Sequence, residues 1–288
     1  MIKLVACDLD GTLFNSNMIV SKENAEAIHN AQKNGIEFLV ATGRAPKESK
    51  VLLKDANIHT GFINLNGALV YDKKGNLKIK HSISKDKAQK IINLLHKNNF
   101  YFEILTTNNV YSENINARIS NIAHLMVDLN PGMTFKEAVA ISAANKSIMN
   151  MTMIDSFDEL LDNSEEIMKI IAFDSRGPAT FVDIKKEIEN IDDLVITSSS
   201  SSNIEINNIN AQKGIALLDY AKLNGIKREK VAAIGDNLND ESMIREAGIG
   251  VAMGNAIPAI KHLAQLETKT NNNNGVAYIL NKFIKNNA

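Results

Sequence analysis

The stretch IKLVACDLDGT at residues 2–12 decides the fold, because an apolar run ends directly on a pair of carboxylates. Residues 2–7 predict one short buried strand, and Asp8 and Asp10 follow it at once, with a glycine and a threonine after them. An acidic pair in this place is either a solvated turn or a site built to hold a metal ion. An EF-hand calcium loop is excluded, because Gly11 follows the second acid directly, whereas that loop places its glycine later and ends on a glutamate.

The segments around this stretch alternate between apolar strands and amphipathic helices, which is the βαβ pattern of a parallel sheet. In the first segment we expect strands at 2–7 and 36–41, helices at 22–34 and 46–56, and a strand with a hairpin at 61–72. The same alternation returns after Lys213, with helices expected at 213–225, 240–248, 257–266 and 276–284 and strands at 230–235 and 250–254.

The region between these two segments does not continue the alternation. It predicts a helix at 84–99, two short strands within 100–112, and helical segments near 113–145 and 156–170. We therefore predict an α/β protein with a doubly wound, Rossmann-like parallel-sheet core. This core domain consists of residues 1–82 and 208–288, and an α+β domain is inserted at 83–207.

The composition of the 288 residues favours a small-molecule partner. Lys plus Arg number 32 and Asp plus Glu 33, so the net charge of −1 gives no overall field that would attract nucleic acid. The single cysteine, Cys7, excludes an internal disulfide and fits a reducing compartment. The apolar start is too short for a signal peptide, and no apolar run reaches the about 20 residues of a membrane span. We expect a cytoplasmic protein that binds neither nucleic acid nor a membrane.

Several polar residues follow strands of the predicted sheet, where ligands of open α/β sheets collect. Three or four carboxylates at one edge repel one another unless a cation lies among them, and oxygen ligands suit Mg²⁺. Magnesium commonly shares its coordination with phosphate oxygens, so a small phosphorylated metabolite is the expected substrate. The residues expected at this edge are Asp8, Asp10, Thr42, Gly43, Asp236, Asn239 and Asp240, with Lys213 as a cation for the phosphate.

The acidic pair offers the two groups that phosphate-ester hydrolysis needs. A carboxylate such as Asp8 can attack phosphorus to give an aspartyl-phosphate, which divides one displacement into two easier steps. Asp10 would protonate the leaving oxygen and then activate the water that hydrolyses the intermediate.

Four motifs resemble those of the haloacid dehalogenase-like phosphohydrolases. They are DLDGTL at 8–13, ATGR at 41–44, Lys213 in QKGIAL, and GDNLND at 235–240. NLNGA at 64–68 and GVAMGNA at 250–256 further resemble the Cof-type branch, which carries a large α+β cap between the second and third motifs. The resemblance extends over the whole chain and implies that the inserted domain is such a cap.

The resemblance also implies residue roles. Asp8 would be the nucleophile and Asp10 the acid and base, while Asn66 and Asn255 would line the site less directly. Mg²⁺ would be held by Asp8, the backbone carbonyl of Asp10, and Asp236, with Asp240 as a ligand or directly behind one. The phosphate-binding residues would be Leu9, Thr42, Gly43, Lys213 and Asn239.

One stretch departs from the pattern. At 270–278 the chain reads TNNNNGVAY, where relatives tend to have acidic residues before the Gly-Val. The departure concerns a minor support of the metal-binding loop and not the catalytic residues. In the inserted domain NIEI at 203–206, Arg118 and His124 are possible substrate contacts, with a packed side chain as the alternative for His124.

The leading hypothesis is a Mg²⁺-dependent phosphatase of sugar phosphates or related metabolites. A phosphotransferase or phosphomutase of the same superfamily is an alternative, since such enzymes differ mainly in their caps. A phospho-receiver signalling protein is a second alternative, although its phosphoacceptor follows a later strand, its domain is about half as long, and Asp10 would have no role there.

Overall fold

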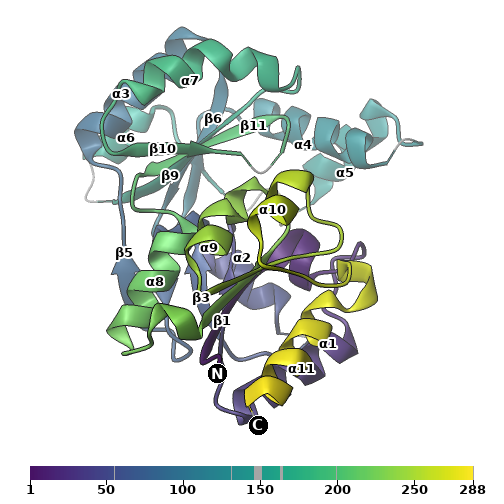
Figure 1. Cartoon of the computed structure of the whole chain (residues 1–288). Coiled ribbons are helices and arrows are strands. Elements are labelled where there is room, and N and C mark those ends of the chain that lie inside the picture. The colour runs from purple at the N-terminus through teal and green to yellow at the C-terminus, as the bar shows by residue number, and fades with distance from the viewer. Residues whose placement is uncertain (55, 131, 146–150, 163–164, 199, 288) are drawn as a thin grey trace. The chain divides into compact units, whose positions relative to one another are not determined.

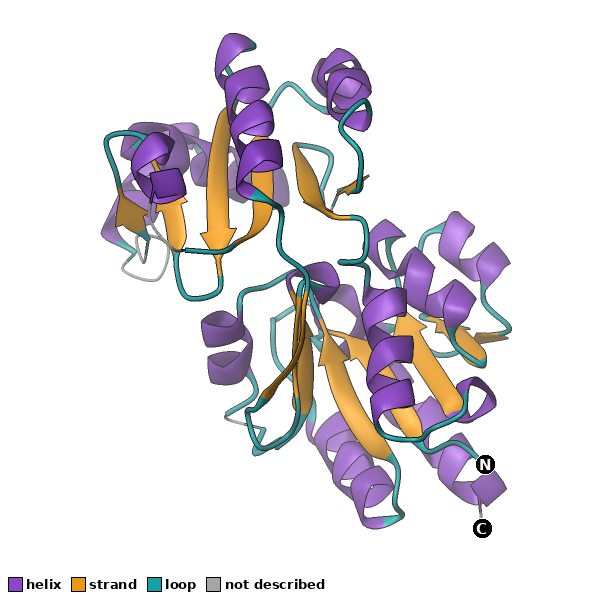
Figure 2. Cartoon of the chain, turned by 90° about the vertical axis from the view of Figure 1, so that its left-hand side faces the viewer, coloured by secondary structure: helices purple, strands orange, loops and turns teal. Residues whose placement is uncertain are grey.

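The computed structural model describes residues 1–54, 56–130, 132–145, 151–162, 165–198 and 200–287. The chain divides into two compact units. Unit 1 comprises Met1–His81 and Asn210–Ala288, and unit 2 comprises Ser82–Ile209. Each unit has its own sheet with helices packed against it (Figure 2).

Unit 1 contains a sheet in the order β14-β13-β12-β1-β2-β3-β4-β5, in which β14 to β3 run parallel and β4 and β5 are antiparallel. Its strands are β1 (Leu4–Asp8), β2 (Glu37–Ala41), β3 (Gly61–Asn64), β4 (Leu69–Tyr71), β5 (Leu77–Lys80), β12 (Val231–Gly235), β13 (Ile249–Ala252) and β14 (Leu266–Glu267). Its helices are α1 (Lys22–Lys33), α2 (Pro46–Leu52), α8 (Lys213–Leu223), α9 (Glu241–Glu246), α10 (Pro258–Leu263) and α11 (Gly275–Asn287).

The strand order of unit 1 changes direction at β1 and β12, which makes this point the switch point of the sheet. From β1 the chain moves through α1 to β2, and from β12 it moves through α9 to β13 on the other side. Because parallel crossovers are right-handed, α1 and α9 lie on opposite faces of the sheet. Helix α11 packs beside α1, and α8 packs beside α9 (Figure 1). The predicted doubly wound core is confirmed.

Local sequence signals explain the ends of α1. Ser21 is its N-cap, and the Ser21 hydroxyl accepts a hydrogen bond from the Asn24 backbone N–H at 3.1 Å. Gly35 follows the helix with a positive φ of 75°, a conformation that glycine adopts without a Cβ penalty. One face of α1, with Ala27, Ile28 and Ala31, is buried in the core of unit 1.

Unit 2 contains a largely antiparallel sheet in the order β10-β11-β9-β6-β7-β8. Its strands are β6 (Tyr101–Thr106), β7 (Val110–Ser112), β8 (Thr152–Met153), β9 (Ile167–Phe173), β10 (Leu194–Thr197) and β11 (Asn203–Asn208). Its helices are α3 (Lys85–Lys97), α4 (Ile115–Leu129), α5 (Phe135–Ala144), α6 (Phe157–Asp162) and α7 (Val182–Glu189). Unit 2 is therefore an α+β domain inserted into the chain of unit 1.

The helix expected at 156–170 is wrong in its second half. Helix α6 ends at Asp162, and the apolar run that follows is the strand β9, which pairs with β6 and β11. The run is buried in the sheet, and a short apolar run does not reveal from its periodicity whether it is strand or helix.

The possible substrate contacts of unit 2 have partners within that unit. The NIEI segment lies in β11, where Ile204 and Ile206 are buried in the core, and Glu205 pairs with the buried Lys169 at 2.8 Å. Arg118 Nη1 donates to both carboxylate oxygens of Glu103, at 2.6 and 2.7 Å. The ring of His124 packs against Phe135 with ring centroids 4.6 Å apart.

Candidate active site

The turn after β1 is shaped by a single glycine. Leu9–Leu13 form one wide helical turn, in which Gly11 has a φ of 82° and the Phe14 N–H donates to the Leu9 carbonyl at 2.8 Å. A Cβ on Gly11 would lie 2.5 Å from Asp236 Oδ2. The turn therefore packs directly on Asp236, and only glycine fits there without displacement.

Asp236 is held beside this turn by the sheet and by one hydroxyl. It follows β12, which pairs in parallel with β1, so that Asp8 and Asp236 leave adjacent strands at the same edge. The Thr12 hydroxyl donates to Asp236 Oδ1 at 2.7 Å. The switch point thus brings together two acidic residues that are far apart in the sequence.

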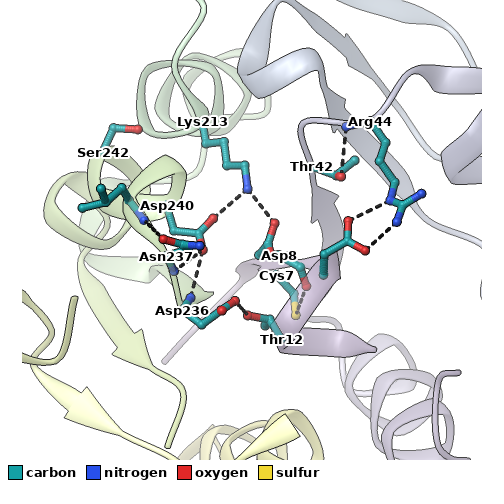
Figure 3. Close-up of polar contacts among 12 residues, drawn as sticks. Cys7, Asp8, Thr12, Thr42, Arg44, Lys213, Asp236, Asn237, Asp240 and Ser242 are labelled. Atoms are coloured by element: carbon teal, nitrogen blue, oxygen red, sulfur yellow. Dashed lines mark hydrogen bonds and ion pairs between the residues drawn. The ribbon is translucent and has the colours of Figure 1, made fainter. Parts of the chain in front are cut away.

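Lys213 lies between two carboxylates. It is the first residue of α8 and is fully buried, and its Nζ donates to Asp8 Oδ1 and to Asp240 Oδ1, both at 2.6 Å (Figure 3). Helix α8 approaches α9 closely here, because Gly214 leaves room for the backbone of Ser242 and donates its N–H to the Ser242 hydroxyl at 3.0 Å. Asp8 is also buried, so a solvated turn and a surface lysine are both excluded at these positions.

Asp240 supports the loop that carries Asp236. Its Oδ2 accepts hydrogen bonds from the backbone N–H groups of Asp236, at 2.9 Å, and Asn237, at 3.1 Å. Its Oδ1 accepts from Lys213. Both oxygens of this buried carboxylate therefore position other parts of the cluster.

Burial raises the pKa values of two carboxylates at this site, those of Asp8 and Asp236. Burial is the largest cause of the raised pKa of Asp8, followed by the nearby Asp240, while Lys213 acts in the opposite direction. Burial also raises the pKa of Asp236 to about 6, against the lowering effect of the hydrogen bond from Thr12. For Lys213, burial lowers the pKa, but Asp240 and Asp8 outweigh it and the net shift is upward.

The cluster has the composition of a cation site. One ligand atom from each of Asp8, Asp236 and Asp240 lies within 4.8 Å of the others. Lys213 neutralises one of these three carboxylates, which leaves a surplus of two negative charges, the charge that a divalent cation supplies. All three side chains offer oxygen, the ligand of hard cations such as Mg²⁺. The residues present therefore fit a divalent metal ion.

The carboxylate of Asp10 points to a different partner. Arg44 Nε and Nη2 each donate to one oxygen of Asp10, both at 2.7 Å, in a bidentate pair. The hydrogen bond to Asp10 is the largest cause of the raised pKa of Arg44. The sequence placed Arg44 in the ATGR motif without a role, and its contact with Asp10 is new from the structure.

The other predicted site residues lie in loops at the same edge of unit 1. Thr42 follows β2 and is buried, and its hydroxyl accepts from the Arg44 N–H at 3.1 Å (Figure 3). Gly43 lies between these two residues, and the Asn66 N–H donates to the Thr42 carbonyl at 3.1 Å. Leu9 is buried in the turn after β1, and Asn239 is half-buried in the short turn Leu238–Asp240.

A family model described as haloacid dehalogenase-like hydrolase matches residues 5–280. The chain belongs to this family. The predicted resemblance to these hydrolases, including their Cof-type branch, is confirmed.

Similar proteins of this family are named as phosphatases. The chain is 35% identical to the phosphatase YwpJ of Bacillus subtilis, over 97% of this chain and 99% of that protein. It is 32% identical to the 5-amino-6-(5-phospho-D-ribitylamino)uracil phosphatase YwtE of the same organism, over 98% of each chain. The solved structure of a haloacid dehalogenase-like hydrolase from B. subtilis matches with a TM-score of 0.84 and 36% identity, over 97% of this chain and 99% of that one.

The family membership confirms the prediction of an enzyme of the phosphatase class. Among the residues that the structure describes, no helix has both the length and the apolar character required to cross a bilayer.

Proposed function

We propose that this haloacid dehalogenase-like hydrolase is a Mg²⁺-dependent phosphatase that hydrolyses small phosphorylated metabolites through an aspartyl-phosphate at Asp8. The observation that carries the proposal is the contact of Lys213 Nζ with Asp8 and Asp240 inside a cluster of three carboxylates. A buried ammonium that holds one oxygen of a carboxylate fixes the rotation of that side chain. The cluster also keeps a surplus of two negative charges, which suits a divalent cation.

Asp8 is the proposed nucleophile. A bond forms between its carboxylate oxygen and phosphorus while the ester P–O bond breaks, which gives the aspartyl-phosphate and the free alcohol. Water then attacks phosphorus, which releases inorganic phosphate and restores the carboxylate. Lys213 stays beside Asp8 throughout and stabilises the negative charge of the phosphoryl group.

Asp10 is the proposed acid and base. It gives a proton to the leaving oxygen in the first step and takes one from the attacking water in the second. Arg44 binds both oxygens of Asp10, so we assign Arg44 as the residue that orients this carboxylate. The phosphate oxygens would be bound by Thr42, Asn239 and Lys213 and by backbone N–H groups at Leu9 and Gly43.

Mg²⁺ would be held by Asp8, Asp236 and the backbone carbonyl of Asp10. Asp240 adds its charge and holds the loop of Asp236 in place through two backbone N–H groups. When bound, the ion supplies positive charge that offsets the charge developing on the transferring phosphoryl group. The raised pKa values of Asp8 and Asp236 support the proposal, because burial disfavours their charged forms and a bound cation would offset that cost.

The substrate class is a small phosphorylated metabolite, either a sugar phosphate or a related compound. One relative is named for a phosphorylated ribitylaminouracil, so a phosphorylated ribityl compound belongs in a substrate panel beside the sugar phosphates.

The test is release of inorganic phosphate from an aryl phosphate and from this panel, in Mg²⁺ or in EDTA, by the wild type and by Asp8→Asn. We expect multiple turnovers by the wild type in Mg²⁺ and loss of turnover in EDTA or in Asp8→Asn. Turnover that survives in Asp8→Asn would overturn the proposal. Phosphate that appears on an added sugar instead of in solution would identify a phosphotransferase.

A further inference from the structure

A group of asparagines joins three loops of unit 1 at the candidate site. Asn255 Nδ2 donates to the carbonyl of Gly11 at 2.8 Å, and Asn255 Oδ1 accepts from the Asn271 backbone N–H at 2.9 Å. The side-chain amide of Asn271 donates to the Phe14 carbonyl at 2.9 Å. The Ser16 N–H donates to Asn272 Oδ1 at 2.9 Å. Residues 11–16 are thus held at three points by the loop 270–274 and by Asn255.

Gly11 needs an external restraint. Glycine has the widest conformational freedom of any residue. Gly11 lies between Asp10, the proposed acid and base, and Thr12, whose hydroxyl donates to Asp236. A peptide unit is planar, so a hydrogen bond to the Gly11 carbonyl fixes the orientation of the whole peptide that leads into Thr12. Asn255 therefore restrains the turn at Gly11, its residue with the widest conformational freedom.

The loop that carries Asn255 also contacts the other half of the site. The Met253 N–H donates to the Gly235 carbonyl, and the Ile257 N–H donates to the Asp236 carbonyl, both at 3.0 Å. Asn255 lies between these two residues. The loop 253–257 therefore positions Asp236 through the loop's own backbone N–H groups, and it positions Gly11 through the side chain of Asn255.

We propose that Asn255 is a positioning residue of the phosphoryl-transfer site, which holds the Gly11 carbonyl and so keeps the Asp10–Thr12 turn in register with Asp236. Its effect on turnover rests on the proposed function, whereas its effect on the turn does not. Asn255 is exposed, so it contributes little to the packed core and its loss leaves the fold intact.

The contacts also explain which positions need an amide. Asn255 and Asn271 donate to backbone carbonyls, which a carboxylate cannot do. Asn272 only accepts in its contact with Ser16, so an acidic residue would serve equally well there. This gives a matched pair of substitutions. Asn255→Asp replaces the donor to Gly11 with an oxygen, while Asn272→Asp adds the same charge to the neighbouring loop and keeps its hydrogen bond.

The first test is hydrogen–deuterium exchange of the peptide that covers residues 9–16, in EDTA and without substrate. We expect Asn255→Asp and Asn255→Ala to raise the exchange rate of this peptide by about tenfold, in line with the loss of one hydrogen bond. Asn272→Asp and Asn273→Ala should exchange as the wild type does. Asn272→Asp keeps the acceptor for Ser16, and the Asn273 side chain, among the residues that the structure describes, bonds within its own loop, to Thr270 Oγ1. Unchanged exchange in both Asn255 variants would overturn the proposal.

The second test is steady-state phosphate release in Mg²⁺. We expect Asn255→Asp to lower kcat by about tenfold, with a urea midpoint equal to that of the wild type, and Asn272→Asp to stay within about twofold. An equal loss in both Asp variants would assign the effect to charge and overturn the positioning role. If the wild type releases no phosphate at all, the proposed function fails, and the exchange experiment still decides whether Asn255 restrains the turn.

Discussion

Replacement of Lys213 by methionine removes the ammonium that two buried carboxylates share. The side chain of Lys213 is fully buried, and Asp8 and Asp240 are each 2.6 Å from it and almost without solvent contact. Methionine keeps most of the apolar stem of the side chain, so the change isolates the charge. The variant leaves Asp8 and Asp240 buried without their cation.

The expected loss follows from this burial. Removal of one partner from a buried ion pair costs about 3–5 kcal/mol, because the remaining charge is left uncompensated. With a urea slope of about 3 kcal/mol per M, this corresponds to a shift of about 1–1.7 M in the midpoint of unfolding. The matched control is Lys222→Met, on the exposed side of the same helix, where we expect a change within about 0.5 kcal/mol.

The loss should depend on pH. The raised pKa of Asp8 means that this carboxylate takes up a proton as the pH falls, after which it no longer needs Lys213. The difference in unfolding free energy between wild type and Lys213→Met should therefore be largest near pH 7.5 and smaller at pH 5. The assay is urea unfolding in EDTA at both pH values, followed by far-UV circular dichroism. A difference below about 1 kcal/mol at pH 7.5, or one that grows towards pH 5, would refute the reasoning.

Three further outcomes are expected of the same site. Because the pKa of Asp236 is raised from 3.8 to about 6, its ionised form weakens the metal-free fold as the pH rises through this range. Asp236→Asn in EDTA should thus be more stable than the wild type above pH 6, by up to about 3 kcal/mol, and equal to it below pH 4, as measured by urea unfolding. Mg²⁺ at about 100 times its Kd should stabilise the wild type by about 2.7 kcal/mol, and Asp236→Asn should show no comparable gain in a thermal-shift titration. Gly11→Ala places a Cβ at 2.5 Å from Asp236 Oδ2, on a backbone with positive φ, so Mg²⁺ stabilisation and phosphate release should both be lost while circular dichroism still reports a folded protein.

Much of the site could be predicted from the sequence, because parallel strands bring their carboxyl ends to one edge. Asp8 and Asp236 each follow a short apolar run, and the pairing of β1 with β12 makes them neighbours. Lys213 is the first residue of α8, a helix that the sequence predicts. The roles assigned to these residues as nucleophile, metal ligand and phosphate ligand stay predictions.

Other features depend on packing that spacing does not report. The contact of Arg44 with Asp10 depends on the rotamers of two side chains from different loops. The bond from Asn255 to Gly11 depends on the convergence of three loops, none of which has a periodic pattern. The sequence does not distinguish the strand β9 from a helix, because its neighbours β6 and β11 decide its conformation and come from distant parts of unit 2.

The most direct test of the proposed chemistry is the pre-steady-state release of aryl alcohol from an aryl phosphate by Asp10→Asn in Mg²⁺. An aryl oxide leaves without help from an acid, whereas hydrolysis of the aspartyl-phosphate still needs the base. We predict a burst of one aryl alcohol per active site followed by slow turnover, with the phosphoryl group recovered on Asp8 after acid quench, and no burst from Asp8→Asn. A phosphoryl group recovered on another residue, or steady turnover by Asp8→Asn, would contradict the assignment of Asp8 as the nucleophile.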